Sequence, residues 1–222
     1  RGFFPLPLPM RDLPWLRKLI DWTTKNRMNL FSTHSAEVFG CQWEKVRRRL
    51  IPELKKRGMM IKAGGHCYAF FLPPDRYFEE HPEWFSLVKG KRVPNNICFS
   101  NEEGVSTLKS NVLRYLEDHP EVDLIAIWPN DVPTLCECDK CRMLSPSDHV
   151  LRLVNRVSKA VHEAKPSIKV EHIAYWNYLV PPVLTTPERN VTVLFAARGR
   201  NYSYPFNHCD WGEWRDYVYK HY

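Results

Sequence analysis

The chain has 222 residues, of which 44% are hydrophobic and 26% charged, and its formal net charge is +7. This composition is typical of a globular protein and excludes disordered, collagen-like and coiled-coil chains. No apolar run approaches the roughly 20 residues that a membrane helix needs, so we expect no membrane span. The length is sufficient for a buried core, and we expect residues 1–222 to form a single domain.

The positive charge permits nucleic-acid binding, but the basic residues are dispersed. The densest clusters, Arg47–Arg49 and Lys55–Arg57, lie in one amphipathic segment, where a solvated helix face is the simpler interpretation. Eight Trp and 18 Pro residues are more informative, because aromatic rings beside rigid loops can stack on sugar rings. Most individual Trp side chains would still belong to the core. These features are typical of a sugar-binding cleft, so we expect a glycan partner and no nucleic acid.

Segments with the pattern of a strand alternate with segments with the pattern of an amphipathic helix. In chain order we expect a strand at 2–4, a helix at 12–26, a strand at 29–33, a helix at 42–57 and a strand at 59–62, then a long loop over 67–100. A helix follows at 101–119, a strand at 123–128, a helix at 147–165, strands at 169–174 and 191–196, and a last helix at 210–221. Ser100 or Asn101 would cap the helix at 101–119, and Ser147 the helix at 147–165.

This alternation predicts an α/β fold of parallel strands covered by helices. A doubly wound sheet and a (β/α)8 TIM barrel both fit the pattern. The barrel is favoured because polar and aromatic residues follow the strand ends, which converge on one mouth in a barrel. About six βα units do not close an eight-stranded barrel. We therefore expect an incomplete barrel, a segment of a longer protein truncated on its C-terminal side.

Asn130 and Asp131 are the strongest catalytic candidates, because an apolar strand leads directly to both. Trp128 and Pro129 would form a wall of the site and favour the protonated form of the carboxyl group. A neutral carboxylic acid can protonate a glycosidic oxygen, and an adjacent amide can hold an acetamido group or a water. The alternative is that Asp131 only caps the following turn.

Other residues at the strand ends are candidates for substrate binding. They are His34, His66, Trp128, Tyr175, Trp176, Asn177 and Arg198. Histidines can donate hydrogen bonds to sugar hydroxyls, aromatic rings can stack, and an arginine can bind a polar group. Each has a structural alternative: a satisfied histidine, a packed aromatic corner or a solvated arginine. Gly64-Gly65, before His66, would either let a ligand approach the backbone or make a turn.

Cys136, Cys138 and Cys141 form a Cys-x-Cys-x-x-Cys run. Three thiols this close can bind zinc, whose structural sites take four sulfur or nitrogen ligands. The candidates for the fourth ligand are Cys67, Cys209, His66 and His208. One disulfide with a free thiol is the alternative, although an odd total of seven Cys argues against a complete disulfide framework.

Several runs of the sequence resemble the domain-of-unknown-function 4838 (DUF4838) proteins. These runs are Gly64–His66, Phe71–Glu83, Cys98–Asn101, Trp128–Asp131, Cys136–Cys141 and Ser147–Arg152. The likeness spans nearly the whole chain. The opening Arg1-Gly2 and residues 26–34 are also similar to the start of family 20 hexosaminidase-type barrels.

The resemblance implies a (β/α)8 glycoside hydrolase domain in a bacterial, exported, multidomain protein. Characterised relatives form glycoside hydrolase family 163, endo-β-N-acetylglucosaminidases that cut the chitobiose core of N-glycans. In related hexosaminidase barrels an acidic pair after the fourth strand polarises the 2-acetamido group and protonates the leaving oxygen. The acetamido oxygen is the nucleophile, which makes the retaining mechanism substrate-assisted and independent of a cofactor.

The matching pair here is Asn130-Asp131 instead of two acids. Asn130 can orient an acetamido group but cannot take its proton, and Asp131 has a shorter reach than Glu. A second acid would come from Glu37, Glu171 or Asp210, or from strands beyond this segment. The departure motivates a second hypothesis, a glycan-binding barrel without catalysis. A third, from the Cys run and the charge, is a zinc-dependent interaction or nucleic-acid protein. Linkage, metal identity and oligomeric state stay open.

Overall fold

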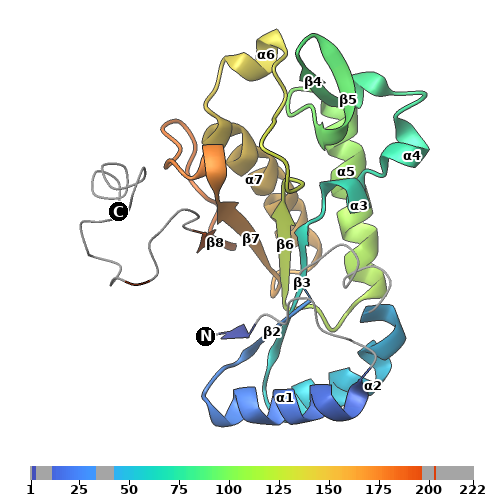
Figure 1. The fold of residues 1–222 in the computed structure, drawn as a ribbon, viewed down its shortest axis with the longest axis vertical. Helices are drawn as coiled ribbons and strands as arrows, with labels where there is room; N and C mark the ends of the chain where they lie inside the picture. Colours follow the sequence, from blue (N-terminus) through green and yellow to red (C-terminus); the bar gives the residue numbers. More distant parts are fainter. Residues whose placement is uncertain (1, 4–11, 34–42, 197–202, 204–222) are drawn as a thin grey trace.

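The computed structural model describes residues 2–3, 12–33, 43–196 and 203. They form a parallel sheet with helices around it and a separate antiparallel hairpin (Figure 1). The strands of the sheet are β1 (Gly2–Phe3), β2 (Leu30–Thr33), β3 (Met60–His66), β6 (Leu124–Trp128), β7 (Lys169–Ala174) and β8 (Val191–Phe195). The four long helices are α1 (Leu13–Lys25), α2 (Trp43–Lys56), α5 (Glu102–Asp118) and α7 (Pro146–Ala164).

The order of the strands distinguishes a barrel from a doubly wound sheet. The sheet runs β1-β2-β3-β6-β7-β8, and every neighbouring pair is parallel. Each strand is therefore added on the same side as the one before, without the reversal that a doubly wound sheet requires. This is the order of a barrel wall. Within the described residues β1 and β8 are its two edges, so no closed barrel is formed.

β3 is longer than the sequence predicts, because it continues through Gly64 and Gly65 to His66. Of the two alternatives for Gly64-Gly65, the turn is wrong. Gly64 has φ +85°, and a Cβ atom on it would lie 2.2 Å from the carbonyl oxygen of Ala126 on β6. Only a glycine allows this close approach of the two strands. The register then pairs His66 with Trp128, so β3 and β6 end at the same level.

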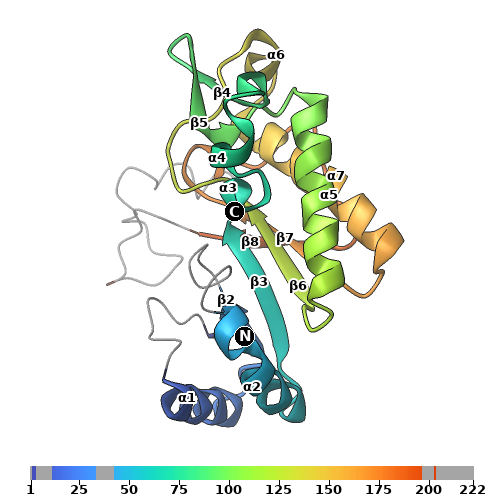
Figure 2. The same cartoon turned by 90° about the vertical axis from the view of Figure 1, so that its right-hand side faces the viewer.

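The prediction of a long loop over 67–100 is wrong, because this segment contains short helices and two strands. It contains α3 (Tyr68–Phe71), α4 (Pro74–Tyr77), η2 (Pro82–Trp84) and the hairpin of β4 (Phe85–Val88) and β5 (Lys91–Ile97). Lys89 and Gly90, between the two strands, both have positive φ, as a tight two-residue hairpin turn requires. The hairpin and α6 (Asp139–Arg142) lie next to each other beyond the carboxyl ends of the parallel strands (Figures 1 and 2).

One of the two predicted helix caps is confirmed. The Asn101 side chain accepts a hydrogen bond from the Gly104 N–H, at 2.8 Å, and caps α5. The cap predicted at Ser147 is wrong, because Ser145 Oγ accepts from the Asp148 N–H at 3.0 Å. Pro146 is tolerated in the first turn of a helix, so α7 begins earlier than its apolar pattern indicates. The last helix expected, at 210–221, lies outside the described residues.

Two hydrophobic clusters stabilise the described part of the molecule. The larger packs α5 and α7 against β3, β6 and β7, and all five residues of β6 are buried, as predicted for a central parallel strand. The smaller packs α1 and α2 against β2 and β3. No helix among the described residues is long and apolar enough to cross a membrane.

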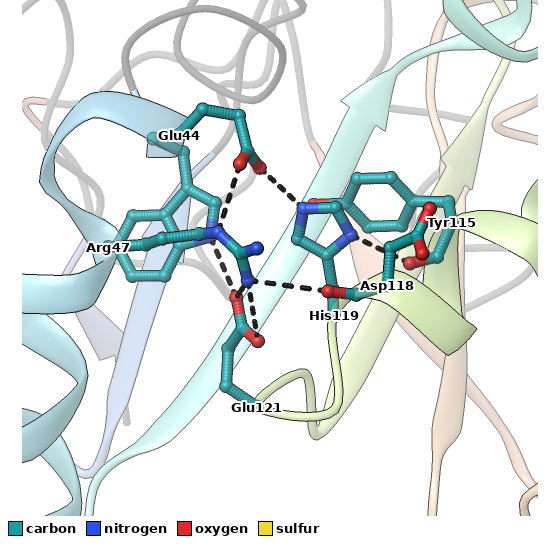
Figure 3. A network of polar contacts seen from close by, with 7 residues as sticks. Glu44, Arg47, Tyr115, Asp118, His119 and Glu121 are labelled. Carbon is teal, nitrogen blue, oxygen red and sulfur yellow. Dashed lines mark hydrogen bonds and ion pairs between the residues drawn. The ribbon is translucent and has the colours of Figure 1, made fainter.

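A polar network joins α2 to the segment between α5 and β6 (Figure 3). Arg47 Nη1 lies 3.0 Å from Glu121 Oε1, and Arg47 Nε lies 2.9 Å from Glu44 Oε2. His119 Nε2 lies 2.5 Å from Glu44 Oε1. Glu121 comes just before β6, so the network lies at the amino ends of the strands. In a barrel, that end serves stability and the opposite end carries the chemistry.

Candidate active site at the carboxyl ends of the strands

Three strands bring separate segments of the chain together at the expected mouth. His66 ends β3, and its ring centroid lies 5.4 Å from that of Trp128, at the end of β6. The same ring lies 5.9 Å from Tyr175, which follows β7. The structure therefore brings these three residues together at one edge of the sheet.

His66 is oriented by the backbone and faces Asp131. Its Nδ1 lies 2.5 Å from the carbonyl oxygen of Pro129, which can only accept, so Nδ1 carries a proton. Nε2 lies 3.9 Å from Asp131 Oδ1. The Asp131 side chain is 56% exposed, so Trp128 and Pro129, which are both buried, do not enclose the carboxylate as expected. Trp128 packs against His66. Lys62 Nζ lies 4.6 Å from the centroid of the Trp128 ring.

Three hydrogen bonds join Asn130 to other elements. Its Oδ1 accepts from the Ala69 N–H at 3.0 Å, and its Nδ2 donates to the Asn95 carbonyl at 2.9 Å. Its backbone N–H donates to Asn96 Oδ1 at 2.8 Å. Asn130 therefore ties the end of β6 to α3 and β5 and fixes the position of Asp131. Sequence reasoning missed Asn95 and Asn96, because only the hairpin brings them to this loop.

Tyr175 and Trp176 form a stacked aromatic pair beside His66. Their ring centroids are 5.1 Å apart and their planes differ by 12°. Trp176 begins η3 (Trp176–Tyr178) with φ +48°, a left-handed conformation that is strained for a bulky residue. Such strain is concentrated at functional sites. Asn177 is exposed and donates from Nδ2 to the Pro133 carbonyl at 3.3 Å, which joins η3 to the loop after β6.

The remaining candidates are placed elsewhere or outside the description. His34, Arg198, Glu37 and Asp210 lie outside the described residues. Glu171 is on β7, buried in an ion pair with Lys62 of β3. Burial raises the pKa of Glu171 against the opposing charge of Lys62, and burial lowers the pKa of Lys62. The Glu171 carboxylate is therefore held in this ion pair with Lys62 and does not lie at the mouth.

Comparison with known families decides the classification of the chain. A family model described as "Domain of unknown function (DUF4838)" matches residues 9–220. The chain belongs to this family.

Solved structures show which fold the DUF4838 chain shares. An O-GlcNAc hydrolase of Thermobaculum terrenum, solved as a mutant, aligns with a TM-score of 0.52 and 12% identity over 86% of this chain and 39% of that one. A β-galactosidase of Rahnella sp. R3 aligns with a TM-score of 0.47 and 14% identity over 76% and 35%. The DUF4838 chain thus spans less than half the length of either structure. The likeness to the O-GlcNAc hydrolase shows a glycosidase-like fold. A comparison with curated proteins finds no match.

The DUF4838 chain also gathers four cysteines away from the mouth. The sulfurs of Cys98, Cys136, Cys138 and Cys141 all lie within 4.8 Å of one another. Cys98 Sγ is 3.7 Å from Cys138 Sγ and 4.0 Å from Cys141 Sγ, far beyond a disulfide bond of about 2.05 Å. Hydrogen bonds from Cys136 and Cys141 hold the pKa of the Cys98 thiol well below its usual value. All five described cysteines are free.

The fourth member of this cluster differs from every predicted candidate. Cys98 directly follows β5, whereas Cys67 is buried elsewhere, and its thiol donates to the Ala126 carbonyl at 3.3 Å. Burial raises the pKa of Cys67 to about 12, which makes this thiol unreactive. His66 belongs to the mouth. Cys209 and His208 lie outside the described residues.

Proposed function

We propose that this chain forms the catalytic-type barrel of a glycoside hydrolase that acts on N-acetylglucosamine-containing glycans, an endo-β-N-acetylglucosaminidase with a substrate-assisted retaining mechanism. The observation that carries the proposal is the convergence of a histidine, a carboxylate and a stacked aromatic pair at the carboxyl ends of β3, β6 and β7. The glycosidase-like fold supports it, because barrel enzymes place their active sites at this end. From the family resemblance we also propose that the protein is bacterial and exported.

In the proposed reaction, Tyr175 and Trp176 stack on the C–H face of a sugar. In the reaction, Asp131 acts as the general acid. Asp131 gives its proton to the glycosidic oxygen while the 2-acetamido oxygen attacks the anomeric carbon and the bond to the leaving group breaks. Water then attacks the same carbon and loses a proton to the Asp131 carboxylate, which restores the acetamido group.

His66 and Asn130 would support this chemistry by position. His66 presents Nε2 toward Asp131 and can orient the carboxyl group. Asn130, a catalytic candidate from the sequence, has both ends of its amide bonded to backbone groups, so we assign it the positioning of Asp131. A role as acetamido partner stays a prediction that uses its remaining lone pair or amide hydrogen.

A second candidate function is glycan binding without catalysis. Asp131 is the one carboxylate that lies beside His66 among the described residues, and Glu171 is paired with Lys62. The described part of the mouth, with one acid and two stacked rings, suits binding as well as hydrolysis. The two functions differ in one outcome, the release of product.

Mass spectrometry of glycans released from a complex-type N-glycoprotein tests the proposal. Asp131→Asn removes the proton donor with little change in shape, and Asp75→Asn is the control, because Asp75 is exposed on α4. We expect release by the wild type and the control, and a rate at least about 100-fold lower for Asp131→Asn. Circular dichroism checks that all three chains are folded.

Each other result selects a different interpretation. Binding of the glycan without release by the folded wild type favours the glycan-binding barrel. Equal release by Asp131→Asn and wild type overturns the assignment of Asp131.

A further inference from the structure

We propose that Cys98, Cys136, Cys138 and Cys141 bind one Zn²⁺ ion in a tetrahedral site, and that this site clamps the β4–β5 hairpin to the loop that carries Asn130 and Asp131. The inference does not rest on the proposed hydrolase activity. It combines a sequence run of three cysteines with a fourth that only the fold supplies.

The spacing of the sulfurs fits zinc. Four sulfurs about 2.3 Å from a central Zn²⁺ in tetrahedral geometry stand about 3.8 Å apart. The Cys98–Cys138 and Cys98–Cys141 separations are 3.7 and 4.0 Å, and none of the six separations exceeds 4.8 Å. Small rotations of the side chains therefore bring all four sulfurs to bonding distance. Four thiolates are also the soft ligand set that selects zinc over magnesium or calcium.

The surroundings of the sulfurs have the features of a metal site. The Leu87 N–H donates to Cys136 Sγ at 3.3 Å. The Ser100 hydroxyl lies 3.3 Å from Cys98 Sγ and 3.4 Å from Cys138 Sγ. Hydrogen bonds of this kind orient metal-bound thiolates. Arg92 lines the same surface hollow as Cys98 and Cys138, and its guanidinium can offset the negative charge of a tetrathiolate. The hollow, about 360 Å³ in volume, gives the ion a route to the sulfurs.

The coordination assigns a structural role to the metal. Four protein ligands fill a tetrahedral shell and leave no position for a water or a substrate. The ion would therefore activate nothing. Its effect is to hold together two segments that are distant in the sequence, and binding displaces the protons of the ligating thiols.

The clamp acts next to the hydrogen bonds that position the candidate catalytic loop. Asn96, two residues before Cys98, donates from Nδ2 to the Thr134 carbonyl at 3.0 Å and accepts from the Asn130 N–H at 2.8 Å. Thr134 is two residues before Cys136. The two segments that meet at Asn96 and Asn130 are therefore each followed, a few residues later, by a proposed metal ligand. Loss of the metal frees the two segments to separate, and the hold on Asn130 weakens.

Metal analysis of the purified chain tests the site. The chain is purified without chelator, and zinc is measured by inductively coupled plasma mass spectrometry. We expect about one zinc per chain in the wild type and less than about a fifth of that in Cys98→Ser. Cys67→Ser is the matched control, because Cys67 is a buried cysteine outside the cluster, and it should keep the full zinc content.

Cobalt provides a readout that stands if Cys98→Ser fails to fold. Zinc is removed from the wild type with a chelator, and Co²⁺ alone is added back. We expect the intense visible absorption of tetrahedral cobalt bound to thiolates, and its loss when Zn²⁺ displaces the cobalt. Full zinc content in Cys98→Ser overturns the ligand set. A wild type that contains no zinc and gives no cobalt spectrum, or one in which mass spectrometry finds these cysteines in disulfides, overturns the site.

Hydrogen exchange tests the clamp separately from the metal. Removal of zinc from the wild type should speed the exchange of amides at 85–98 and 129–138, while those of β6 and the middle of α7 stay protected. Exchange that is unchanged at 129–138 overturns the clamp and leaves a zinc site without this role. Both readouts are independent of glycan release, so failure of the proposed function leaves this inference intact.

Discussion

Two glycines with a similar left-handed backbone have different surroundings. Gly64 has φ +85°, and a Cβ there would lie 2.2 Å from the Ala126 carbonyl oxygen. Gly58 has φ +64°, and a Cβ there would meet nothing within 4 Å. We expect Gly58→Ala to cost about 1 kcal/mol and Gly64→Ala at least about 2 kcal/mol more, measured by urea unfolding. Equal costs would show that β3 and β6 do not approach this closely.

His172 on β7 makes the stability depend on pH. It is 3% exposed, and its Nδ1 has no hydrogen-bond partner among the described residues. Burial lowers its pKa to about 4, so the folded chain holds a neutral ring where the unfolded chain, with an ordinary pKa of about 6.5, binds a proton. This contribution to stability is fully present above pH 6.5 and is lost as the pH falls toward 4.

The size of this effect can be isolated with a variant. Between about pH 7.5 and about pH 5.5, urea unfolding should show that His172→Gln loses about 1 kcal/mol less stability than the wild type. His162→Gln, at an exposed position of α7, is the control and should follow the wild type. If the wild type and both variants lose the same stability over this range, the neutral ring of His172 is not the source of the pH dependence.

At the scale of a single element, α7 shows how a helix start is decided by a side chain. Ser145 Oγ accepts from the Asp148 N–H, whereas Ser147 is buried and its hydroxyl has no partner in the described part of the chain. We expect Ser145→Ala to cost about 1 kcal/mol, because it removes the cap. Ser147→Ala should be neutral or slightly stabilising, because it removes an unsatisfied buried hydroxyl. Thermal unfolding of both variants measures the difference, and a reversed order would restore Ser147 as the cap.

At the scale of the whole molecule, the polar network at the amino ends of the strands connects the two hydrophobic clusters. Arg47 comes from α2, in the smaller cluster, and Glu121 precedes β6, in the larger one (Figure 3). Arg47→Met leaves the buried Glu121 carboxylate without its guanidinium partner, and we expect a loss of about 3 kcal/mol. Arg48→Met, at an exposed position of the same helix, should change the stability by less than about 0.5 kcal/mol. Denaturant unfolding of the two variants compares them, and a small effect of Arg47→Met would mean that water replaces the ion pair.

Local patterns in the sequence determined the elements of the fold. The sequence pattern located every long helix within the described residues by the period of its apolar residues, because one buried face imposes that period. It located the strands of the parallel sheet by short apolar runs. It missed the β4–β5 hairpin and extended β3 too little, because short strands and a glycine pair carry no period. The strand-end residues only favoured a barrel over a doubly wound sheet, and the observed strand order lacks the reversal that a doubly wound sheet requires.

The sequence by itself also determined which strand ends carry polar and aromatic residues, and that three cysteines lie within one short run. Only the tertiary structure decided that Asn95 and Asn96 hold Asn130, that Glu171 is paired with Lys62, and that Cys98 completes the cysteine cluster. The physical reason is common to these cases. Spacing along the chain reports contacts within one element, whereas these contacts join groups between 34 and 109 residues apart in the chain, which only the packing of the hairpin and the strands brings within bonding distance.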